Sequence, residues 1–291
     1  MSTLVKEIMD TLAKNRPNIT SSSIKTYTSL LTNLLKKVDS NTFDTFNDTD
    51  KCIQFLSGLK SEQTIKTTLS ALYVLTKNDK YKSNMVKYSE IVNKQYSEKK
   101  TKESRKQSNL TQEKIKEIYD DLKKKVATNP TYDNYNNYII VCLTSGLFIA
   151  PRRNLDWVAM KLKNIDKDKD NYINGNNFIF NQFKTAKFAT ENDKKVAIPK
   201  ELKTILNKWK KLNNQDYLIF QHNEKPFTSS SFTKTLSKIY GNGVGVDALR
   251  SLYLTSHFSD VAQKLQALND TTKKMGSSSA SALQYYIKED L

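Results

Sequence analysis

Two adjacent tyrosines near the end of the sequence, Tyr285 and Tyr286, have a setting in which they could do chemistry. They follow a run of small residues, 277–282, and no long apolar side chain occurs in that run before Leu283. A terminal helix of this composition adds little to a core, but it could carry a phenol to a place where a nucleophile is needed. Because the chain holds 15 tyrosines, ordinary packing explains these two equally well when they are taken alone.

An arginine pair marks the first of three cationic motifs that precede the tyrosines. Arg152 and Arg153 stand at the end of a predicted buried helix, 138–147, and Asp156 follows them. Cations at this end of a helix are stabilised by its terminal carbonyl groups. A helix cap or an ion pair with Asp156 would therefore account for the pair without any function.

The other two motifs place a lysine and an arginine further along the chain. Lys184 and Lys187 follow a predicted strand, and Arg250 stands near the start of a predicted helix, three residues after Asp247. Solvated hairpin lysines and a structural salt bridge are the simpler explanations for each motif alone. Together with the tyrosines, the motifs favour a joint site.

Charge and composition indicate the class of partner. The chain has 291 residues and a net charge of +17, with 47 basic and 30 acidic residues. A positive field of this size favours a polyanionic partner such as nucleic acid. An AT-rich genome or selection for a soluble surface would also produce a lysine excess. Hydrophobic residues make up 37% and charged residues 26%, which fits a globular protein of two domains.

Several other classes of protein are excluded by absent signals. No apolar run approaches the roughly 18 residues of a membrane span, and the N-terminus lacks the apolar stretch of a signal peptide. Cys52 and Cys142 stand far apart in apolar helical contexts, and the two histidines are also distant from each other. We therefore expect free buried thiols in an intracellular protein of nucleus or cytoplasm, with no metal and no cofactor. The glycines of 241–245 lack the lysine of a phosphate-binding loop.

Residues 1–96 predict a small all-helical domain. The clearest helix covers 24–38, where apolar residues recur at helical spacing behind a possible N-cap in 20–23. Further helices are expected at 4–12, 50–59, 63–75 and 86–96. Residues 97–109 contain no apolar side chain and predict a solvated linker. Its cations could equally lie along a phosphate backbone: Lys99, Lys100, Lys102, Arg105 and Lys106.

Residues 110–291 predict a second, mainly α-helical domain with a small β-hairpin or sheet. Thr111 is placed to cap a helix that continues to Val126, and 138–147 is apolar on nearly all faces, as in a buried central helix. Apolar and polar residues alternate with a period of two between 172 and 199, and this alternation predicts the strands. Further helices are expected at 202–212, 229–240, 247–258 and 260–268.

The order and spacing of the four motifs resemble the catalytic domain of tyrosine recombinases (integrases), which share their active-site plan with type IB topoisomerases. Arg153 fits the first arginine in the family motif Gly-Leu-Arg-x-x-Glu-Leu, and Arg152 is the alternative. Lys184, about thirty residues later and followed by threonine, matches the lysine of the family's β-hairpin. Arg250 matches the arginine of its His-x-x-Arg motif.

The tail completes the resemblance. Residues 275–278 fit the family's Leu-Gly-His-Ser motif, and Tyr286 stands nine residues after Ser277, where the family has its nucleophile. The first domain resembles the helical core-binding domain, which clamps DNA, through Tyr27 and the run 64–72. The asparagine- and lysine-rich style is similar to recombinases of large DNA viruses and their mobile elements.

The resemblance implies metal-free cleavage of DNA through a 3′-phosphotyrosine intermediate. Tyr286 would attack the scissile phosphate, and Tyr285 would point about 100° away on the same helix. Because a free phenol has a pKa of about 10, Arg153 and Arg250 would have to stabilise the charge that develops on the phosphoryl oxygens. Lys184 would protonate the departing 5′-oxygen. Arg152 and Lys187 are expected to contact DNA.

Two positions depart from the family pattern. Asp247 and Ser277 stand where the family has histidines. Ser277 can still donate one hydrogen bond to a phosphate oxygen, whereas an ionised Asp247 cannot donate, although it could accept the tyrosine proton or orient Arg250. His257 is expected to be a helix-surface residue. These departures favour a slow enzyme or a descendant that only binds DNA.

The sequence therefore predicts a site-specific DNA recombinase that works as a dimer or tetramer on double-stranded DNA. A basic DNA-binding protein without catalysis and a topoisomerase-like relaxing enzyme are the alternatives. Only five residues follow Tyr286. We therefore do not expect a long C-terminal helix that is donated to a neighbouring subunit.

Overall fold

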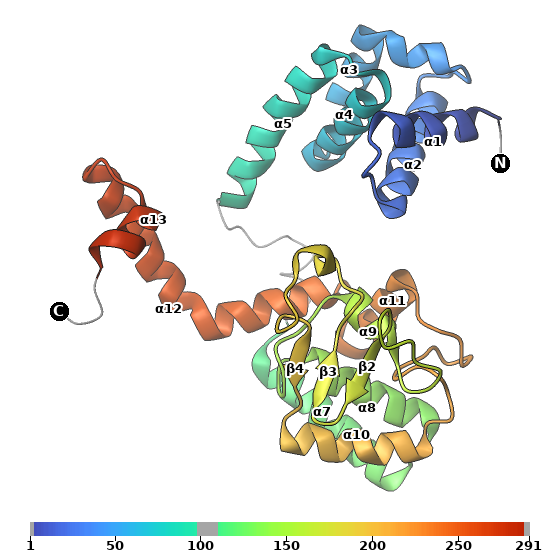
Figure 1. The fold of residues 1–291 in the computed structure, drawn as a ribbon, viewed down its shortest axis with the longest axis vertical. Coiled ribbons are helices and arrows are strands. Elements are labelled where there is room, and N and C mark those ends of the chain that lie inside the picture. The colour runs from blue at the N-terminus through green and yellow to red at the C-terminus, as the bar shows by residue number, and fades with distance from the viewer. Residues whose placement is uncertain (1–2, 98–109, 288–291) are drawn as a thin grey trace. The chain divides into compact units, whose positions relative to one another are not determined.

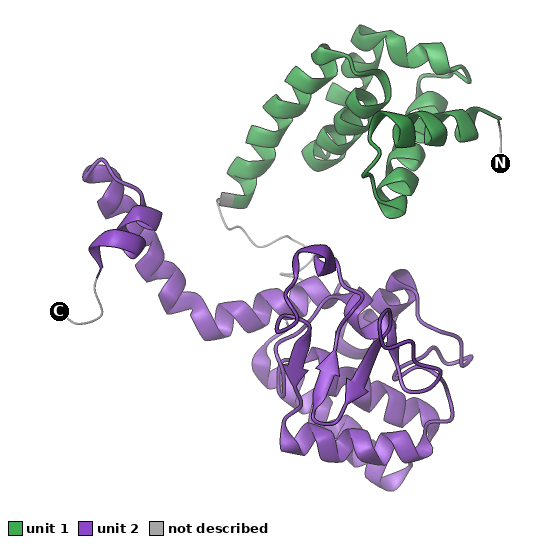
Figure 2. Cartoon of the chain, viewed as in Figure 1, with its two compact units in different colours: residues 1–101 green, residues 102–291 purple. Residues whose placement is uncertain are grey.

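The computed structural model describes residues 3–97 and 110–287 and divides the chain into two compact units, 1–101 and 102–291 (Figure 2). Each unit has its own hydrophobic core. The predicted linker cations, Lys99, Lys100, Lys102, Arg105 and Lys106, lie outside the described residues.

Across its described residues, 3–97, unit 1 is built from helices alone (Figure 1). Its elements are α1 (Thr3–Asn15), α2 (Ser21–Lys37), the 3₁₀ turn η1 (Phe43–Asn47), α3 (Thr49–Ser57), α4 (Glu62–Thr76) and α5 (Asp79–Ser97). Thr20 caps α2, as predicted, and Ser61 caps α4. Helix α5 begins seven residues earlier than predicted, because Tyr81 is buried in the core and its hydroxyl donates to the carbonyl of Phe46 at 2.8 Å.

Unit 2 combines helices with a small sheet, which confirms the predicted mainly α class. The helices of its body are α7 (Gln112–Thr128), α8 (Tyr132–Thr144), α9 (Asn154–Val158), α10 (Lys200–Leu212) and α11 (Ser229–Tyr240). The strands are β1 (Met160–Lys161), β2 (Asn171–Asn174), β3 (Asn177–Ile179) and β4 (Lys195–Ala197), in the order β1-β2-β3-β4. Strands β1 and β2 are parallel, and the other two pairs are antiparallel.

The core of unit 2 lies between the sheet and α8. Helix α8 is buried from Tyr138 to Thr144, as its apolar sequence predicted. Trp157 on α9 packs edge-on against Phe178 and Phe180, with ring centroids 5.2 and 5.4 Å apart. This aromatic cluster joins α9 to strand β3, and so fixes the residues that precede α9.

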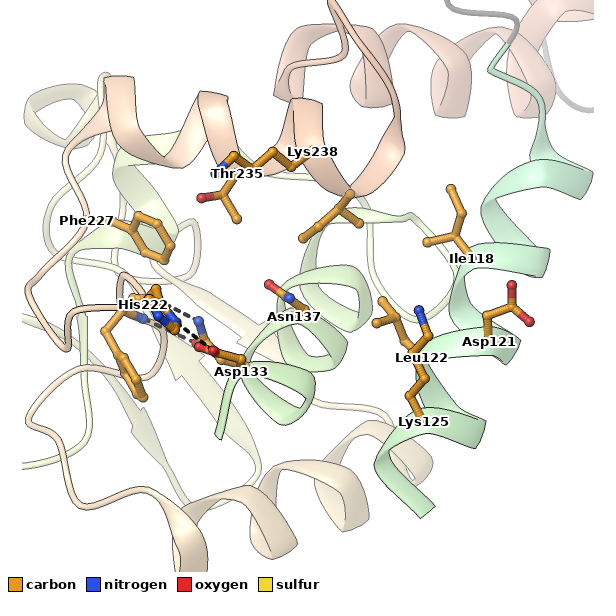
Figure 3. Close-up of a pocket in the computed structure, with 13 residues that line it drawn as sticks. Ile118, Asp121, Leu122, Lys125, Asp133, Asn137, His222, Phe227, Thr235 and Lys238 are labelled. Atoms are coloured by element: carbon orange, nitrogen blue, oxygen red, sulfur yellow. Dashed lines mark hydrogen bonds and ion pairs between the residues drawn. The ribbon is translucent and has the colours of Figure 1, made fainter. Parts of the chain in front are cut away.

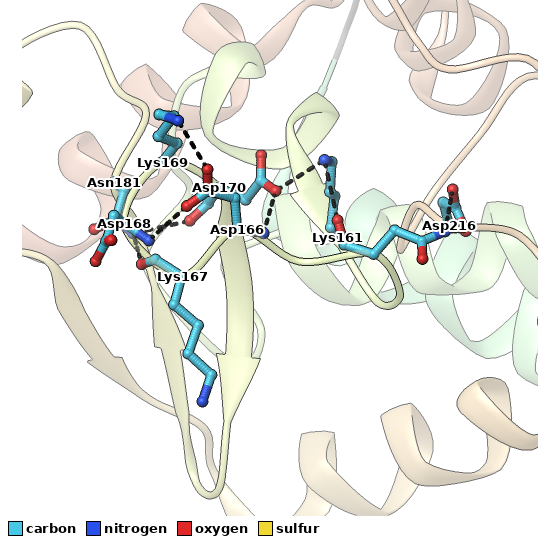
Figure 4. A network of polar contacts seen from close by, with 9 residues as sticks. Lys161, Asp166, Lys167, Asp168, Lys169, Asp170, Asn181 and Asp216 are labelled. Atoms are coloured by element: carbon cyan, nitrogen blue, oxygen red, sulfur yellow. Dashed lines mark hydrogen bonds and ion pairs between the residues drawn. The ribbon is translucent and has the colours of Figure 1, made fainter.

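A network of charged residues fixes the connection between β1 and β2 (Figure 4). Asp170, which is almost fully buried, accepts from Lys161 Nζ and from the backbone N–H of Asp166, both at 2.8 Å. Lys169 pairs with Asp166 at 3.0 Å. These contacts hold the connection between the parallel strands β1 and β2, which contains no helix, at both of its ends.

The structure corrects the predicted end of α8. The helix ends at Thr144, before Gly146, whose φ of +86° is in the left-handed region. A Cβ on Gly146 would lie 2.6 Å from the ring of Tyr253, so only glycine fits there. The arginine pair is therefore not at the end of the buried helix. It stands just before α9, and Arg153 is the N-cap residue of that helix.

The predicted helices 247–258 and 260–268 form one long element, α12 (Val246–Lys274), with a kink at Phe258 (φ −136°, ψ 19°). Figure 1 shows α12 leading away from the body of unit 2. We call its distal part, residues 259–274, together with the tail 275–287, the C-terminal arm. Its exposed apolar side chains include Val261 and Leu265.

The tail is not the regular terminal helix that the sequence predicted. It consists of the short α13 (Ser279–Ser281) and a π-helical turn, η3 (Ala282–Tyr286). It folds back onto α12, where Ala282 and Thr272 are buried and the N–H of Ser277 donates to the carbonyl of Thr272 at 2.8 Å. None of the described helices is long and apolar enough to cross a membrane. Both cysteines are buried free thiols.

Candidate active site

The centre of the candidate site is the buried carboxylate of Asp156 on α9, which is only 3% exposed. Its Oδ2 accepts a hydrogen bond from Nε of Arg152 at 2.7 Å, and its Oδ1 has no hydrogen-bond partner within the described residues. Burial raises the pKa of Asp156, although the positive charges of Arg152, Arg153 and Arg250 act in the opposite direction. Arg152 thus binds this carboxylate directly, and the charges of Arg153 and Arg250 also act on it.

Arg152 is held on two sides. Besides its bond to Asp156, its guanidinium carbon lies 3.9 Å from the ring centroid of Phe180 and 5.5 Å from that of Phe183. The side chain is 22% exposed. A planar guanidinium on an aromatic face gains cation–π energy and loses freedom to turn. Arg152 is thus a fixed part of the site's wall.

Arg153 has more freedom than its neighbour. It is half-buried, and its side chain makes no hydrogen bond or ion pair with the part of the chain that the structure describes. The helix that it precedes is tied to α11, since Asn154 Nδ2 donates to the carbonyl of Ser229 and to Thr233 Oγ1. Arg153 therefore offers an unengaged guanidinium beside Asp156.

Arg250 lies in the first turns of α12, as predicted. The buried side chains of Val246 and Leu249 anchor this part of the helix in the core. Nη1 of Arg250 lies 3.9 Å from Oδ1 of Asp247, which is 77% exposed. An ion pair this long and this exposed contributes little. The guanidinium of Arg250 remains available to an anion.

Lys184 and Lys187 lie in the connection between the antiparallel strands β3 and β4, which confirms the predicted hairpin. Both side chains are exposed. Lys187 Nζ lies 4.7 Å from the ring centroid of Phe188, an aromatic side chain that is 79% exposed. This connection therefore exposes the ammonium groups of Lys184 and Lys187 and the aromatic ring of Phe188 to solvent.

Ser277 and Tyr286 lie on the C-terminal arm, away from the arginines. Tyr286 is 69% exposed and Tyr285 is 60% exposed. No hydrogen bond or ring contact within the described residues joins Tyr286 to Lys184 or to the arginines. The distal part of α12 alone spans about 24 Å at 1.5 Å per residue. The structure gathers the arginines and leaves the phenol exposed at a distance.

A separate cavity of about 450 Å³ opens between α7, α8 and α11 (Figure 3). Its lining combines apolar side chains such as Leu122 and Phe227 with polar ones such as Asn137. At its rim, Nδ1 of His222 lies 2.5 Å from Asp133. None of the predicted catalytic residues lines this cavity. Within the described residues, no three metal-ligating side chains gather in a way that could hold a metal ion.

Three features of the site were not predicted from the sequence. They are the aromatic face beneath Arg152, the packing of Tyr253 on Gly146, and a fixed orientation of His257. The alternation of Phe178 and Phe180 across the residues before Lys184 was the available signal for the first. The other two depend on tertiary contacts with no sequence signature.

Comparison with solved structures identifies the fold. A lambda integrase fragment, residues 75–356, in a dimer bound to a COC′ core site is 17% identical, with a TM-score of 0.50, and the match covers 89% of this chain and 90% of that one. A longer lambda integrase dimer on the same core site is also 17% identical, with a TM-score of 0.50 and coverage of 90% and 71%. No family model and no curated protein matches the sequence significantly. The chain therefore has the fold of the tyrosine recombinases.

Proposed function

We propose that this protein is a site-specific recombinase that cleaves and rejoins double-stranded DNA through a covalent tyrosine–phosphate intermediate. The observation that carries the proposal is that Arg152 binds Asp156 while the positive charges of Arg153 and Arg250 act on the same carboxylate. Two of these guanidiniums are not engaged in close ion pairs, and such groups match the geometry of phosphoryl oxygens.

In this proposal Arg153 and Arg250 bind the non-bridging oxygens of the scissile phosphate. The phenol oxygen of Tyr286 attacks phosphorus, and the bond from phosphorus to the 5′-oxygen breaks. Lys184 gives a proton to that oxygen. Attack by a 5′-hydroxyl on the phosphotyrosine then restores the phenol and rejoins the strand. Charge builds up on the phosphoryl oxygens in both steps, where the guanidiniums of Arg153 and Arg250 stabilise it most.

Asp247 and Ser277 take lesser roles in this scheme. Asp247 is exposed and 3.9 Å from Arg250, so it can orient the guanidinium or accept the proton of the phenol. Ser277 lies on the arm with Tyr286 and can donate one hydrogen bond to a phosphate oxygen. Lys187, near Lys184 in the same connection, adds a phosphate contact.

Tyr286 must approach the arginines for the reaction to occur, and assembly on DNA offers a route. The arm exposes apolar side chains that a second copy could cover, among them Val261 at 53% and Leu265 at 45% exposure. The lambda integrase structures of the same fold are DNA-bound dimers. We propose that this protein also self-associates on DNA.

A DNA-binding protein without catalysis is the second candidate. It is favoured by the separation of Tyr286 from the arginines and by Asp247 and Ser277 in place of histidines. Relaxation of supercoiled DNA without strand exchange is a third outcome, because it needs the same covalent step but no second duplex.

One experiment separates the three. Duplexes enriched from a random library by binding would be rebuilt with a nick beside the cleavage position, so that the cleaved strand escapes and the adduct accumulates. The recombinase should form a covalent adduct with wild type and Tyr285→Phe, and none with Tyr286→Phe. Bound DNA without any adduct would leave only the binding protein. Relaxation of plasmids unrelated to the enriched sequence, without joined products, would indicate the topoisomerase-like activity.

A further inference from the structure

His257 is one of only two histidines in the chain, and its ring is held although it is exposed. It is the last residue before the kink of α12 at Phe258. The imidazole stacks on the ring of Tyr253, with centroids 4.1 Å apart and planes at 27°. Tyr253 in turn packs against Gly146, where no side chain would fit. The imidazole therefore has a rigid support that reaches back to the end of α8.

The hydrogen bonds of His257 determine which ring nitrogen is free. Nδ1 lies 2.8 Å from the backbone carbonyl oxygen of Tyr253 and 3.1 Å from Oγ of Ser256. A carbonyl oxygen can only accept, so the close contact requires a hydrogen on Nδ1. Ser256 is fixed as well, since its hydroxyl donates to the Tyr253 carbonyl and accepts from Gln112 Nε2, both at 3.0 Å. Nε2 is consequently the nitrogen left for a ligand.

His257 also shares a helix face with Arg250. Seven residues separate them, and seven steps of about 100° bring the chain to within about 20° of the same direction. The offset along the axis is about 10 Å. Because the kink ends the first segment of α12 after His257, the imidazole stands at a helix C-terminus, where the terminal carbonyl groups favour a positive charge.

We propose that His257 is a phosphate ligand for the DNA backbone, through a hydrogen bond from Nε2 of its protonated ring to a non-bridging oxygen. This inference rests on the part of the proposed function that brings DNA to the Arg250 face. A duplex rises about 3.4 Å per nucleotide on each strand. An offset of about 10 Å therefore places the contact on a neighbouring phosphate of the backbone, not on the scissile phosphate at Arg250.

The charged groups near the imidazole come from two helices. On α12 they are Arg250 on the proximal side and Asp260 and Lys264 beyond the kink, and on α7 Glu113 follows Gln112. Segment 144–150, whose Gly146 lies against Tyr253, contains no charged residue. Unlike the lysines and arginines, an imidazole changes charge between about pH 5 and 8, so its contribution can be isolated by pH.

The second histidine supplies a matched control. His222 is also exposed, but it pairs with Asp133 at the rim of the separate cavity (Figure 3). Affinity for a duplex would be measured by fluorescence anisotropy at constant salt from pH 5.5 to 8. Wild type and His222→Gln should bind roughly three- to tenfold more tightly at the acid end, since a tenfold change corresponds to about one unit in a linked proton equilibrium. His257→Gln keeps a hydrogen-bond donor, the side-chain amide, whose charge does not change with pH. It should lose this increase in affinity at acid pH, which we call the pH step.

A direct readout comes from NMR, because two histidines give only two imidazole signals to follow. Adding duplex DNA at pH 6 should change the chemical shifts of the His257 imidazole and leave those of His222 unchanged. Retention of the full pH step by His257→Gln, or an unmoved His257 signal in the presence of saturating DNA, would overturn the proposal.

A variant that leaves both imidazoles in place tests the support. Tyr253→Leu removes the ring on which His257 stacks while it retains an apolar side chain, and it should reduce the pH step by at least half. An undiminished step would contradict the role of the stack. The cleavage experiment gives a separate result. If affinity depends on pH as described but no covalent adduct forms, the recombinase proposal is refuted and His257 remains a phosphate ligand. If an adduct forms but affinity does not depend on His257 in this way, only the proposal for His257 is refuted.

Discussion

Arg152 donates from Nε to Oδ2 of Asp156 at 2.7 Å, and this ion pair is half-buried on the arginine side and almost fully buried on the carboxylate side. The pair gives the two neighbouring arginines different roles, which the sequence left open. Arg152 is engaged by Asp156 and by Phe180, whereas Arg153 has no such partner within the described residues. We infer that Arg152 maintains the site and that Arg153 binds the reacting phosphate.

Substitution of each arginine by alanine should therefore have different effects. Arg153→Ala should lower the rate of covalent adduct formation by about 10²–10³-fold, as for the loss of one donor to a developing oxyanion. Its stability should change by less than about 0.5 kcal/mol. Arg152→Ala leaves the buried carboxylate of Asp156 without a partner and should cost about 1–3 kcal/mol of unfolding free energy.

Urea unfolding and single-turnover cleavage measure these two quantities. Trp157 and Trp209 are the only tryptophans, and both lie in unit 2, so their fluorescence reports the unit that contains both arginines. These roles for the two arginines are wrong if Arg152→Ala is as stable as wild type and if Arg152→Ala, not Arg153→Ala, loses cleavage.

Binding to DNA should depend steeply on salt, because each phosphate contact releases counterions. The slope of log K against log salt should fall in magnitude by about 0.9 for each phosphate contact removed. Lys187→Gln should produce a change of that size and Lys184→Gln a similar one, while Lys169→Gln, which pairs with Asp166, should leave the slope unchanged. Equal slopes for all four proteins would show that the β3–β4 connection does not contact DNA.

The exposed apolar side chains of the arm should be needed for assembly and not for folding. Val261→Lys combined with Leu265→Lys should abolish dimers or tetramers on DNA, because it places charges on the surface that a second copy would cover. The free energy of unfolding should hardly change, since both side chains are about half exposed.

The opposite face of the same helix provides the control. Gln263→Lys with Gln266→Lys adds the same two charges to exposed polar positions and should leave assembly intact. Mass photometry of the DNA complexes gives the stoichiometry. Unchanged assembly in the Val261 and Leu265 variant would place the subunit contact elsewhere.

The Asp170 network predicts an acid-sensitive contribution to stability. Burial alone would raise the pKa of Asp170, but hydrogen bonds from Lys161 and from the backbone of Asp166 outweigh it and leave that pKa below its ordinary value. A carboxylate with a lowered pKa in the folded state stabilises the fold above its unfolded pKa of about 3.9. This contribution is lost as the pH falls through the lower, folded value.

Asp170→Asn should therefore be less stable than wild type at pH 7, and the difference should shrink as the pH falls from 5 to 3. Asp168→Asn, at an exposed position in the same connection (Figure 4), serves as the control and should follow wild type. Tryptophan fluorescence in urea measures all three. A difference that stays constant down to pH 3 would mean that Asp170 acts through packing alone.

Local patterns were sufficient to predict most of the elements. The apolar stripe and the cap at Thr20 predicted α2, and the alternation around Phe178 predicted the strands that flank Lys184. They were insufficient where a distant residue decides. The end of α8 depends on Tyr253, which is more than a hundred residues later and fills the space beside Gly146.

The site shows the same division. The position of Arg250 near a helix start follows from local pattern, and so does the position of Lys184 between two strands. The engagement of Arg152 by Phe180 depends on how β3 leaves the sheet, and no spacing in the sequence encodes that. The continuity of α12 was not predicted either: the expected helices 247–258 and 260–268 are one helix that only bends at Phe258.

The bend at Phe258 has a consequence for how this chain tolerates changes in length. Since a single non-helical residue joins the two segments of α12, the direction of everything beyond it is set by one pair of torsion angles and by the count of residues that follow. One residue inserted into 259–274 would turn Tyr286 by about 100° around the helix and advance it by about 1.5 Å. An insertion of seven would restore its azimuth to within about 20° and lengthen the reach by about 10 Å. Natural variation in this segment should accordingly occur in multiples close to whole helical turns.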